Sequence, residues 1–478
     1  MNRILYVYVK GGAPLDYAFP RIAACGELHV LALAPLPTIG EEVWRPACTG
    51  IETVPDAPRG DELVELIVDH AKAIGADAVL TLSEFAVLAV AHAASRLGLA
   101  GPGAGIVRAR DKRLMREAWA AAGVPVPGFR RVDSLADLDA ALAAFTPPLL
   151  LKPAWGAGSV AQIVLESPED AAPAWAGIED GLRAGSRVGM NELYAPDTDL
   201  DRLVEEIAQG STEGWYEEPG YGDYVSVEGI VADGVYRPLA ITAKLPTVPS
   251  FVEVASTSPC VMPVPLQRRI EEVSRQAVDA LGLENCGTHT ELKLMADGGL
   301  VVIETAARFG GLLTTRQVHE VFGLDPIGML VRQLLGERVE YPEAMPTTGA
   351  RAAASVAVVP ADAAGVPWRT RPVWDPRAVD WQSLLSPGST IEAVPAFAMP
   401  AGQPVPAFDP SAGSRNWLGV YLLTAADAAT LRRDCNAVLN GLEAALHRAA
   451  GQDAAPADPH RTEPDRAEPD RADLNPAG

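Results

Sequence analysis

Two glutamates, Glu291 and Glu304, stand on either side of an Asp297-Gly298 pair in the stretch THTELKLMADGGLVVIETAARFGG, residues 288–311. An Asp-Gly pair between alternating apolar and polar residues predicts two antiparallel strands joined by a two-residue turn. That turn would place Glu291 directly opposite Glu304, with Cβ atoms about 4.5 to 5.5 Å apart, where like charges are destabilising. A divalent cation would offset this cost, and Mg2+ prefers one or two carboxylates completed by phosphate oxygens and water. The hairpin therefore predicts a Mg2+ site, and a solvated hairpin with two exposed glutamates is the alternative.

The same register predicts an apolar face on the other side of the hairpin. It pairs Leu292 with Ile303 and Leu294 with Val301, as a half-buried antiparallel pair requires. Lys293 would lie on the glutamate side, where it could help to hold anions.

Arg308 follows Glu304 by four positions and is itself followed by Gly310 and Gly311. An arginine beside a metal site suits bidentate capture of a phosphate or a carboxylate, and a glycine pair lets the backbone approach a ligand closely. Each feature alone also fits a surface ion pair or an ordinary loop. Together they predict a binding site.

The elements that must position this hairpin follow a β/α order at the beginning of the chain. Strands at 3–9, 29–34 and 77–82 alternate with helices at 61–74 and 84–97, which predicts a doubly wound parallel sheet. Ser83 stands where it could cap the second helix. Further on we expect a helix at 109–122, strands at 148–152, 160–165, 224–231, 235–243 and 353–359, and a final helix at 425–449.

These elements predict four regions in an α/β chain with an α+β lid. Residues 1–105 form the doubly wound domain, 106–340 a nucleotide-binding module with its lid at about 125–208, and 341–451 an α+β region without evident chemistry. Residues 452–478 are rich in Pro, Asp and Ala and repeat EPDRA, so we expect a disordered acidic tail.

Composition excludes several classes of function. Lys plus Arg number 39 against 62 Asp plus Glu, a net charge of -23 that disfavours nucleic acid as a partner. No apolar run is long enough to span a membrane, and the N-terminus does not look like a signal peptide, so we expect a soluble, cytoplasmic protein. The five cysteines form no CxxC pair and fit reduced thiols.

The hairpin and several other stretches, in the same order, resemble the ATP-grasp superfamily over residues 3 to about 335. Lys112 after Asp111, and Lys152 before a glycine loop that holds Gly158 and Ser159, look like its two nucleotide lysines and its phosphate-covering loop. The resemblance implies that a hinge reads the adenine and ribose and that Glu291 and Glu304 hold one or two Mg2+ ions, with Mn2+ as an alternative. The hinge residues would be Glu205, Glu206, Ile207 and Ala208.

Other segments look like the bacterial L-amino-acid ligases, which join two amino acids into a dipeptide with ATP. That resemblance implies Glu253 at the amino-acid site, Arg308 on the acyl-phosphate oxygens, and Gly310, Gly311 and Leu312 beside the substrate. Ala306 replaces an asparagine that is a metal ligand in many relatives. Leu312 replaces a bulky tryptophan, so we expect a larger pocket for the first amino acid. Val248 replaces a polar residue near the nucleotide.

Three other functions remain as alternatives. An ATP-grasp enzyme could act on bicarbonate or on another carboxylate, and a catalytically silent nucleotide-binding protein would keep the fold without the reaction. A Rossmann dehydrogenase is disfavoured because no GxGxxG follows the first strand. The expected partners are small amino-acid substrates, and a monomer and a homodimer both stay open.

Overall fold

The computed structural model describes residues 1–156, 161–187, 192–194, 201–248, 252–410 and 412–451. The predicted acidic tail, together with Gly158 and Ser159, lies outside these residues. Within them, no helix combines the length and the apolar character needed to cross a membrane.

The chain begins with a sheet of four parallel strands in the order β3-β2-β1-β4. Helices cover both faces: α1 packs with β1 and β2 in one apolar cluster, and α3 and α4 form a second cluster on the other face. The predicted doubly wound sheet is therefore confirmed. Its elements are β1 Arg3–Tyr8, α1 Leu15–Ala23, β2 Glu27–Ala32, α2 Glu41–Trp44, β3 Cys48–Thr53, α3 Asp61–Ile74, β4 Ala78–Leu80 and α4 Val87–Leu97.

Ser83 does not cap α4, contrary to the prediction from the sequence. The helix begins only at Val87, and no side chain caps it. The Ser83 hydroxyl instead donates a hydrogen bond to the Lys10 carbonyl at 2.7 Å, because residues 81–86 form a loop between β4 and the helix.

The predicted helix at 109–122 is two helices, α5 Ile106–Arg110 and α6 Lys112–Ala122. Asp111 separates them because its backbone is extended, and its side chain accepts a hydrogen bond from the Arg113 backbone N–H at 2.9 Å. Asp is a favoured N-cap residue for this reason. Lys112 therefore stands at the first position of a new helix.

A second, antiparallel sheet has the order β5-β8-β6-β7. Helices α7 and α8 share an apolar cluster with these strands. The elements are β5 Phe129–Val132, α7 Leu135–Ala144, β6 Leu149–Pro153, β7 Ile163–Leu165, α8 Ala171–Arg187 and β8 Arg202–Glu206.

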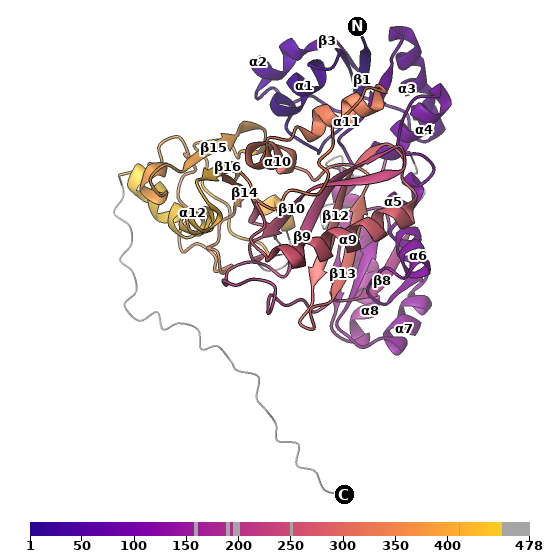
Figure 1. Ribbon diagram of the computed structural model, residues 1–478. Helices are drawn as coiled ribbons and strands as arrows, with labels where there is room; N and C mark the ends of the chain where they lie inside the picture. Colours follow the sequence, from indigo (N-terminus) through magenta and orange to yellow (C-terminus); the bar gives the residue numbers. More distant parts are fainter. Residues whose placement is uncertain (157–160, 188–191, 195–200, 249–251, 411, 452–478) are drawn as a thin grey trace, which may run out of the picture.

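The third sheet has eight strands in the order β13-β12-β9-β10-β11-β14-β16-β15 (Figure 1). The C-terminal strands thus extend the sheet that carries the predicted metal hairpin, because β14 pairs with β11. Its elements are β9 Tyr224–Ala232, β10 Val235–Lys244, β11 Ala255–Ser258, α9 Val264–Leu281, β12 Cys286–Leu294, β13 Leu300–Ala306, α10 Thr314–Phe322, α11 Pro326–Leu334, β14 Ala352–Val358, β15 Thr390–Val394, β16 Gly419–Ala425 and α12 Ala428–Ala449.

Candidate active site

The β12–β13 hairpin places Glu291 directly opposite Glu304, as predicted. The turn and the pairing of the residues next to it differ from the prediction. The turn is one residue longer than predicted: the Met295 N–H bonds to the Gly299 carbonyl at 3.1 Å, with Gly298 at a φ of 75°. The pairing then shifts by one residue between Glu291 and Leu292, which leaves Ile303 as a β-bulge. The longer turn and the bulge compensate each other, so the two glutamates still pair.

The apolar pairs predicted for this hairpin are wrong for the same reason. Leu292 pairs with Val302, and Leu294 pairs with Leu300. These four side chains are fully or almost fully buried, and Ile303 is only half-buried. The longer turn is the physical cause, because one extra turn residue shifts the pairing of every residue between the turn and the bulge by one position.

Glu304 contacts the first nucleotide lysine. Lys112 Nζ lies 2.9 Å from Glu304 Oε1 and donates a hydrogen bond to the Gly156 carbonyl at 2.7 Å. Burial acts to raise the pKa of Glu304, but Lys112, Lys152 and Arg308 outweigh it and lower this pKa to about 2. Glu304 is therefore ionised at neutral pH.

Glu291 belongs to a row of hydrogen-bonded charged side chains that ends at the backbone of Gly310, in the loop after β13. His289 Nε2 is 3.3 Å from Glu291 Oε1, and His289 Nδ1 bonds to the fully buried Glu228. The other Glu228 oxygen accepts a hydrogen bond from the Gly310 backbone N–H at 2.8 Å. Burial acts to lower the pKa of His289, but Glu228 and Glu291 raise it to about 9.

Lys152 and Glu205 form a buried ion pair between neighbouring strands β6 and β8. Arg116 Nε donates to the second Glu205 oxygen at 3.1 Å, so each of the two carboxylate oxygens is paired with a basic side chain. Burial acts to raise the pKa of Glu205, but Arg116 and Lys152 lower it. Of the other proposed hinge residues, Glu206 is exposed, and Ile207 and Ala208 are half-buried.

Arg308 is held by a residue of the loop that follows strand β4 of the first sheet. Its Nε lies 2.7 Å from Glu84 Oε2, in the loop after β4. The other Glu84 oxygen is 3.5 Å from Arg110, which also pairs with Glu192 at 2.8 Å and donates to the Trp155 carbonyl at 2.7 Å. The N-terminal sheet thus contributes a buried carboxylate to this side of the site.

Glu253 lies just before β11 and contacts side chains of the eight-stranded sheet. The Tyr224 hydroxyl donates to its carboxylate, and Lys244 Nζ is 3.6 Å away. Burial acts to raise the pKa of Glu253, but Lys244 and Tyr224 lower it. Trp417, from the C-terminal region, donates to the Glu253 backbone carbonyl at 3.1 Å.

Gly310, Gly311 and Leu312, in the loop after β13, differ in their surroundings. A Cβ on Gly310 would lie 2.8 Å from both His289 Nδ1 and Thr314 Oγ1, whereas a Cβ on Gly311 would meet open space. Leu312 is half-buried at a φ of 57°, a left-handed conformation that is unusual for leucine. Val248 is fully buried and forms a bridge with Val252.

Several charged residues of this site were not singled out from the sequence. Glu84, Arg110, Arg116 and Glu228 are almost completely buried. One signal was present for Arg116: it follows Lys112 by one helical turn, so both point from the same face of α6. Glu228 stood alone among the apolar residues of its strand, where a buried carboxylate needs a partner.

The glutamate pair fits a divalent cation. The side chains of Glu291 and Glu304 are 28% and 26% exposed, so both are reachable from outside, and carboxylate oxygens are the ligands that Mg2+ prefers. Among the described residues there is no group of three or more His, Cys, Asp and Glu arranged for a metal. An ion held here would take its remaining ligands from phosphate and water.

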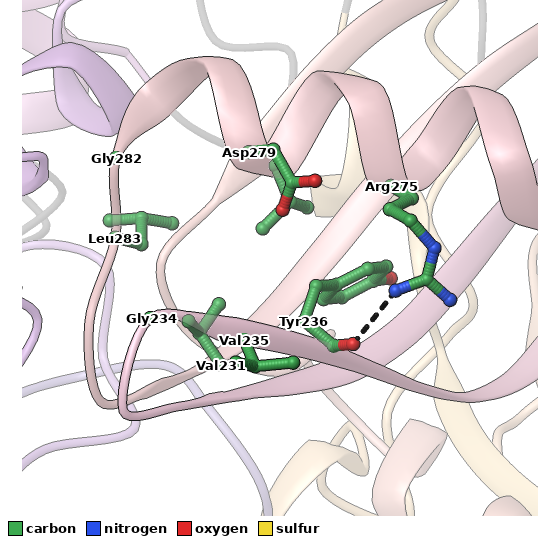
Figure 2. Close-up of a pocket in the computed structure, with 9 residues that line it drawn as sticks. Val231, Gly234, Val235, Tyr236, Arg275, Asp279, Gly282 and Leu283 are labelled. Carbon is green, nitrogen blue, oxygen red and sulfur yellow. Dashed lines mark hydrogen bonds between the residues drawn. The ribbon is translucent and has the colours of Figure 1, made fainter. Parts of the chain in front are cut away.

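A surface pocket of about 320 Å3 lies elsewhere, between the β9–β10 hairpin and the end of α9. Figure 2 shows Arg275 and Asp279 on the helix above Tyr236, whose carbonyl accepts a hydrogen bond from Arg275 at 3.0 Å. None of the predicted site residues lines it.

Comparisons with solved structures identify the fold. An L-amino acid ligase from Bacillus licheniformis superposes with a TM-score of 0.64 at 19% identity, covering 89% of this chain and 94% of that one. The biotin carboxylase domain of a 2-oxoglutarate carboxylase from Hydrogenobacter thermophilus, solved with MgADP and bicarbonate, gives 0.61 at 16% identity, covering 89% and 86%. The protein has the ATP-grasp fold.

One group of curated relatives is similar in sequence as well. The chain is 37% identical over 287 residues to the alanine–anticapsin ligase of Bacillus subtilis. The match spans 60% of this chain and 60% of the length of that relative. No family model matches the sequence.

Proposed function

We propose that this protein is an ATP-dependent carboxylate–amine ligase that joins two amino acids into a dipeptide and releases ADP and phosphate. The observation that carries the proposal is the ionised Glu304, opposite Glu291 and 2.9 Å from Lys112, in an ATP-grasp fold. The similarity to alanine–anticapsin ligase supports an amino-acid substrate.

ATP and Mg2+ are the proposed cofactors, with Glu291 and Glu304 as the metal ligands and Mn2+ as a substitute. The ion would neutralise charge on the transferred phosphoryl group. Lys112 and Lys152, which both lower the pKa of Glu304, would face the same phosphates. Residues 205–208 would carry the adenine, and Gly158 and Ser159 would cover the phosphates.

The reaction needs an activated carboxylate because an amino-acid carboxylate is a poor electrophile. A carboxylate oxygen attacks the γ-phosphorus, the bond to ADP breaks, and an acyl phosphate forms. The amine nitrogen of the second amino acid then attacks the acyl carbon, the bond to phosphate breaks, and the nitrogen gives up a proton. Lys112, Lys152 and Arg308 stabilise the developing negative charge electrostatically.

Arg308 is proposed to hold the acyl-phosphate oxygens, in the orientation that Glu84 gives it. Glu253 would bind the amino group. Gly311 has open space beside its Cα, which lets a substrate approach the backbone, and Leu312 follows it at the pocket for the side chain of the first amino acid.

The division of the chain into four regions, with boundaries after residues 105, 340 and 451, remains part of this proposal. Strands β14, β15 and β16 of the third region are joined to the eight-stranded sheet.

A phosphate-release screen tests the function. The purified protein is given ATP and Mg2+ with single amino acids, with amino-acid pairs, and with bicarbonate. We expect release that requires a pair, with a dipeptide detected by mass spectrometry. Release driven by bicarbonate would favour a carboxylase, and absence of turnover with measurable ATP binding would favour a silent nucleotide-binding protein. If the protein accepted only alanine or glycine as the first amino acid of the dipeptide, the wide pocket proposed at Leu312 would be contradicted.

A further inference from the structure

Arg116 is a fully buried arginine at the meeting point of two sheets. It lies on α6, one helical turn after Lys112. A guanidinium without contact to water is costly unless its donors are matched by acceptors, so its partners indicate why it is there.

The partners of Arg116 belong to two different parts of the proposed ATP site. Its Nη2 donates to the Ile303 carbonyl at 2.6 Å, and its Nε donates to Glu205 Oε2 at 3.1 Å. Ile303 is the bulge residue that directly precedes Glu304. Glu205 belongs to β8, is the first residue of the proposed hinge, and also binds Lys152.

Arginine suits this position better than lysine. Its planar fork presents several N–H donors in fixed directions, so one side chain can bind acceptors on two elements at once. A bulge also leaves ladder groups without their regular partners, and Arg116 takes up one of these carbonyls. The buried group of Arg116, Lys152 and Glu205 has two cations for one carboxylate, and this excess positive charge favours a nearby phosphate.

We propose that Arg116 is a positioning residue that fixes the hinge and Glu304 relative to each other, so that the nucleotide and Mg2+ are bound as one unit. This inference rests on the proposed function. The adenine and the phosphates are parts of one molecule of limited length, so the hinge and the metal carboxylate must stay within a separation that the nucleotide can span. Arg116 bridges them through Glu205 on one side and the Ile303 carbonyl on the other.

The test is Arg116→Lys, which keeps the charge and removes the fork. ADP binding is measured by calorimetry with Mg2+ and with EDTA. Loss of an outer-shell partner typically weakens a metal site about 10- to 100-fold, so we expect the ADP Kd in Mg2+ and the half-saturating Mg2+ concentration to rise about tenfold or more. The ATP KM should rise more than kcat falls at saturating ATP and Mg2+.

Trp119→Phe is the matched control on the same helix. Trp119 is fully buried, and its indole N–H donates to the Ala277 carbonyl at 2.8 Å. Its ring centre lies 5.2 Å from the Arg116 guanidinium, and phenylalanine keeps an aromatic ring beside that group while removing the indole hydrogen bond. Its loss should lower the Tm without changing ADP or Mg2+ affinity. If Trp119→Phe raised the Mg2+ requirement as much as Arg116→Lys did, a purely structural role would replace the proposed one.

Glu205→Gln gives an independent test if Arg116→Lys does not fold. It weakens the hinge side of the bridge and the ion pair with Lys152 but leaves the Arg116 bond to the Ile303 carbonyl in place, and it should also raise the half-saturating Mg2+ concentration for ADP binding. Wild-type protein that binds no MgADP would contradict the proposed function itself. Wild-type binding that Arg116→Lys, or in its place Glu205→Gln, leaves unchanged would contradict the inference alone.

Discussion

The β9–β10 and β12–β13 hairpins are neighbours in one sheet, and both turn at an Asp-Gly pair, yet they are built differently. In the first, Asp233 and Gly234 both have positive φ values, and Ala232 pairs directly with Val235. In the second, only Gly298 has a positive φ, and the turn closes between Met295 and Gly299. The same dipeptide thus closes a two-residue turn in one place and a longer one in the other.

The difference matters for function because only the second hairpin places two carboxylates opposite each other. A strand that met its partner in regular register from this longer turn would pair Glu291 with Ile303. The bulge at Ile303 restores the glutamate pair, and its carbonyl is bound by Arg116. The irregular hairpin is the one that carries the proposed metal site, as bulges beside active sites often do.

The largest effect is expected from Glu304→Gln in the second hairpin, which should strongly reduce ATP turnover. It keeps the shape of the side chain but removes a charge that contacts Lys112 and is proposed to bind Mg2+. Loss of one electrostatic contact to the reacting groups typically costs about 10²- to 10³-fold in kcat, and we expect a loss of this size in ATP turnover. Asp233→Asn, in the turn of the first hairpin, is the control and should keep near-wild-type turnover. Equal rates in both variants would remove Glu304 from the mechanism.

The two hairpins touch through Glu228 on β9 and His289 on β12, which gives the second prediction. The pKa of His289 is raised from 6.5 to about 9, so its charged form stabilises the folded state. This contribution is fully present below pH 6.5 and is lost as the pH rises through 9. The free energy of unfolding should fall by up to about 3 kcal/mol between these values.

Urea unfolding at pH 6.5 and pH 9.5 in the presence of EDTA measures this loss. His289→Gln is the comparison, since its side chain does not titrate in this range. Its free energy of unfolding should change less over the same interval. An equal fall in both proteins would assign the pH dependence to other groups.

The sequence predicted the architecture well where periodicity and turn residues determine it. The parallel sheet, helix α3 and the first hairpin follow from local pattern, and the pairing of Glu291 with Glu304 was also correct. The register near the second turn was wrong because loop length and bulges depend on contacts from elsewhere. One of these is the bond from Arg116, which lies far away in the sequence.

The supporting charges of the site could not be predicted for a similar reason. Glu84 reaches Arg308 from the first sheet, and Glu228 reaches His289 across neighbouring strands. Local sequence identifies a charged residue but not its partner when the partner lies far away in the chain. Only the packing of the elements makes these pairs visible.

Gly310→Ala should destabilise the loop that follows β13. Its Cβ would lie 2.8 Å from His289 Nδ1 and 3.1 Å from Glu228 Oε1, so the contact between the two hairpins would have to shift. Added bulk in a packed site costs about 1 to 3 kcal/mol, and we expect a loss of this size in chemical denaturation. Gly311→Ala is the matched variant, because its Cβ meets open space and should leave stability nearly unchanged. Equal losses would show that the packing against His289 is not the cause.

The smallest effect is expected from alanine at the two turn glycines, Gly234 and Gly298. Both have nearly the same backbone, with φ values of 76° and 75°, and neither would bring its Cβ closer than 3.6 Å to another group. The left-handed conformation disfavours alanine by about 1 kcal/mol, so both variants should lose that amount in thermal unfolding. Equal stability losses in the two variants would be informative because the two turns that contain these glycines differ in length. A much larger loss in Gly298→Ala would mean that the longer turn is itself needed to hold the bulge and the glutamate pair, and ATP turnover would then fall in that variant alone.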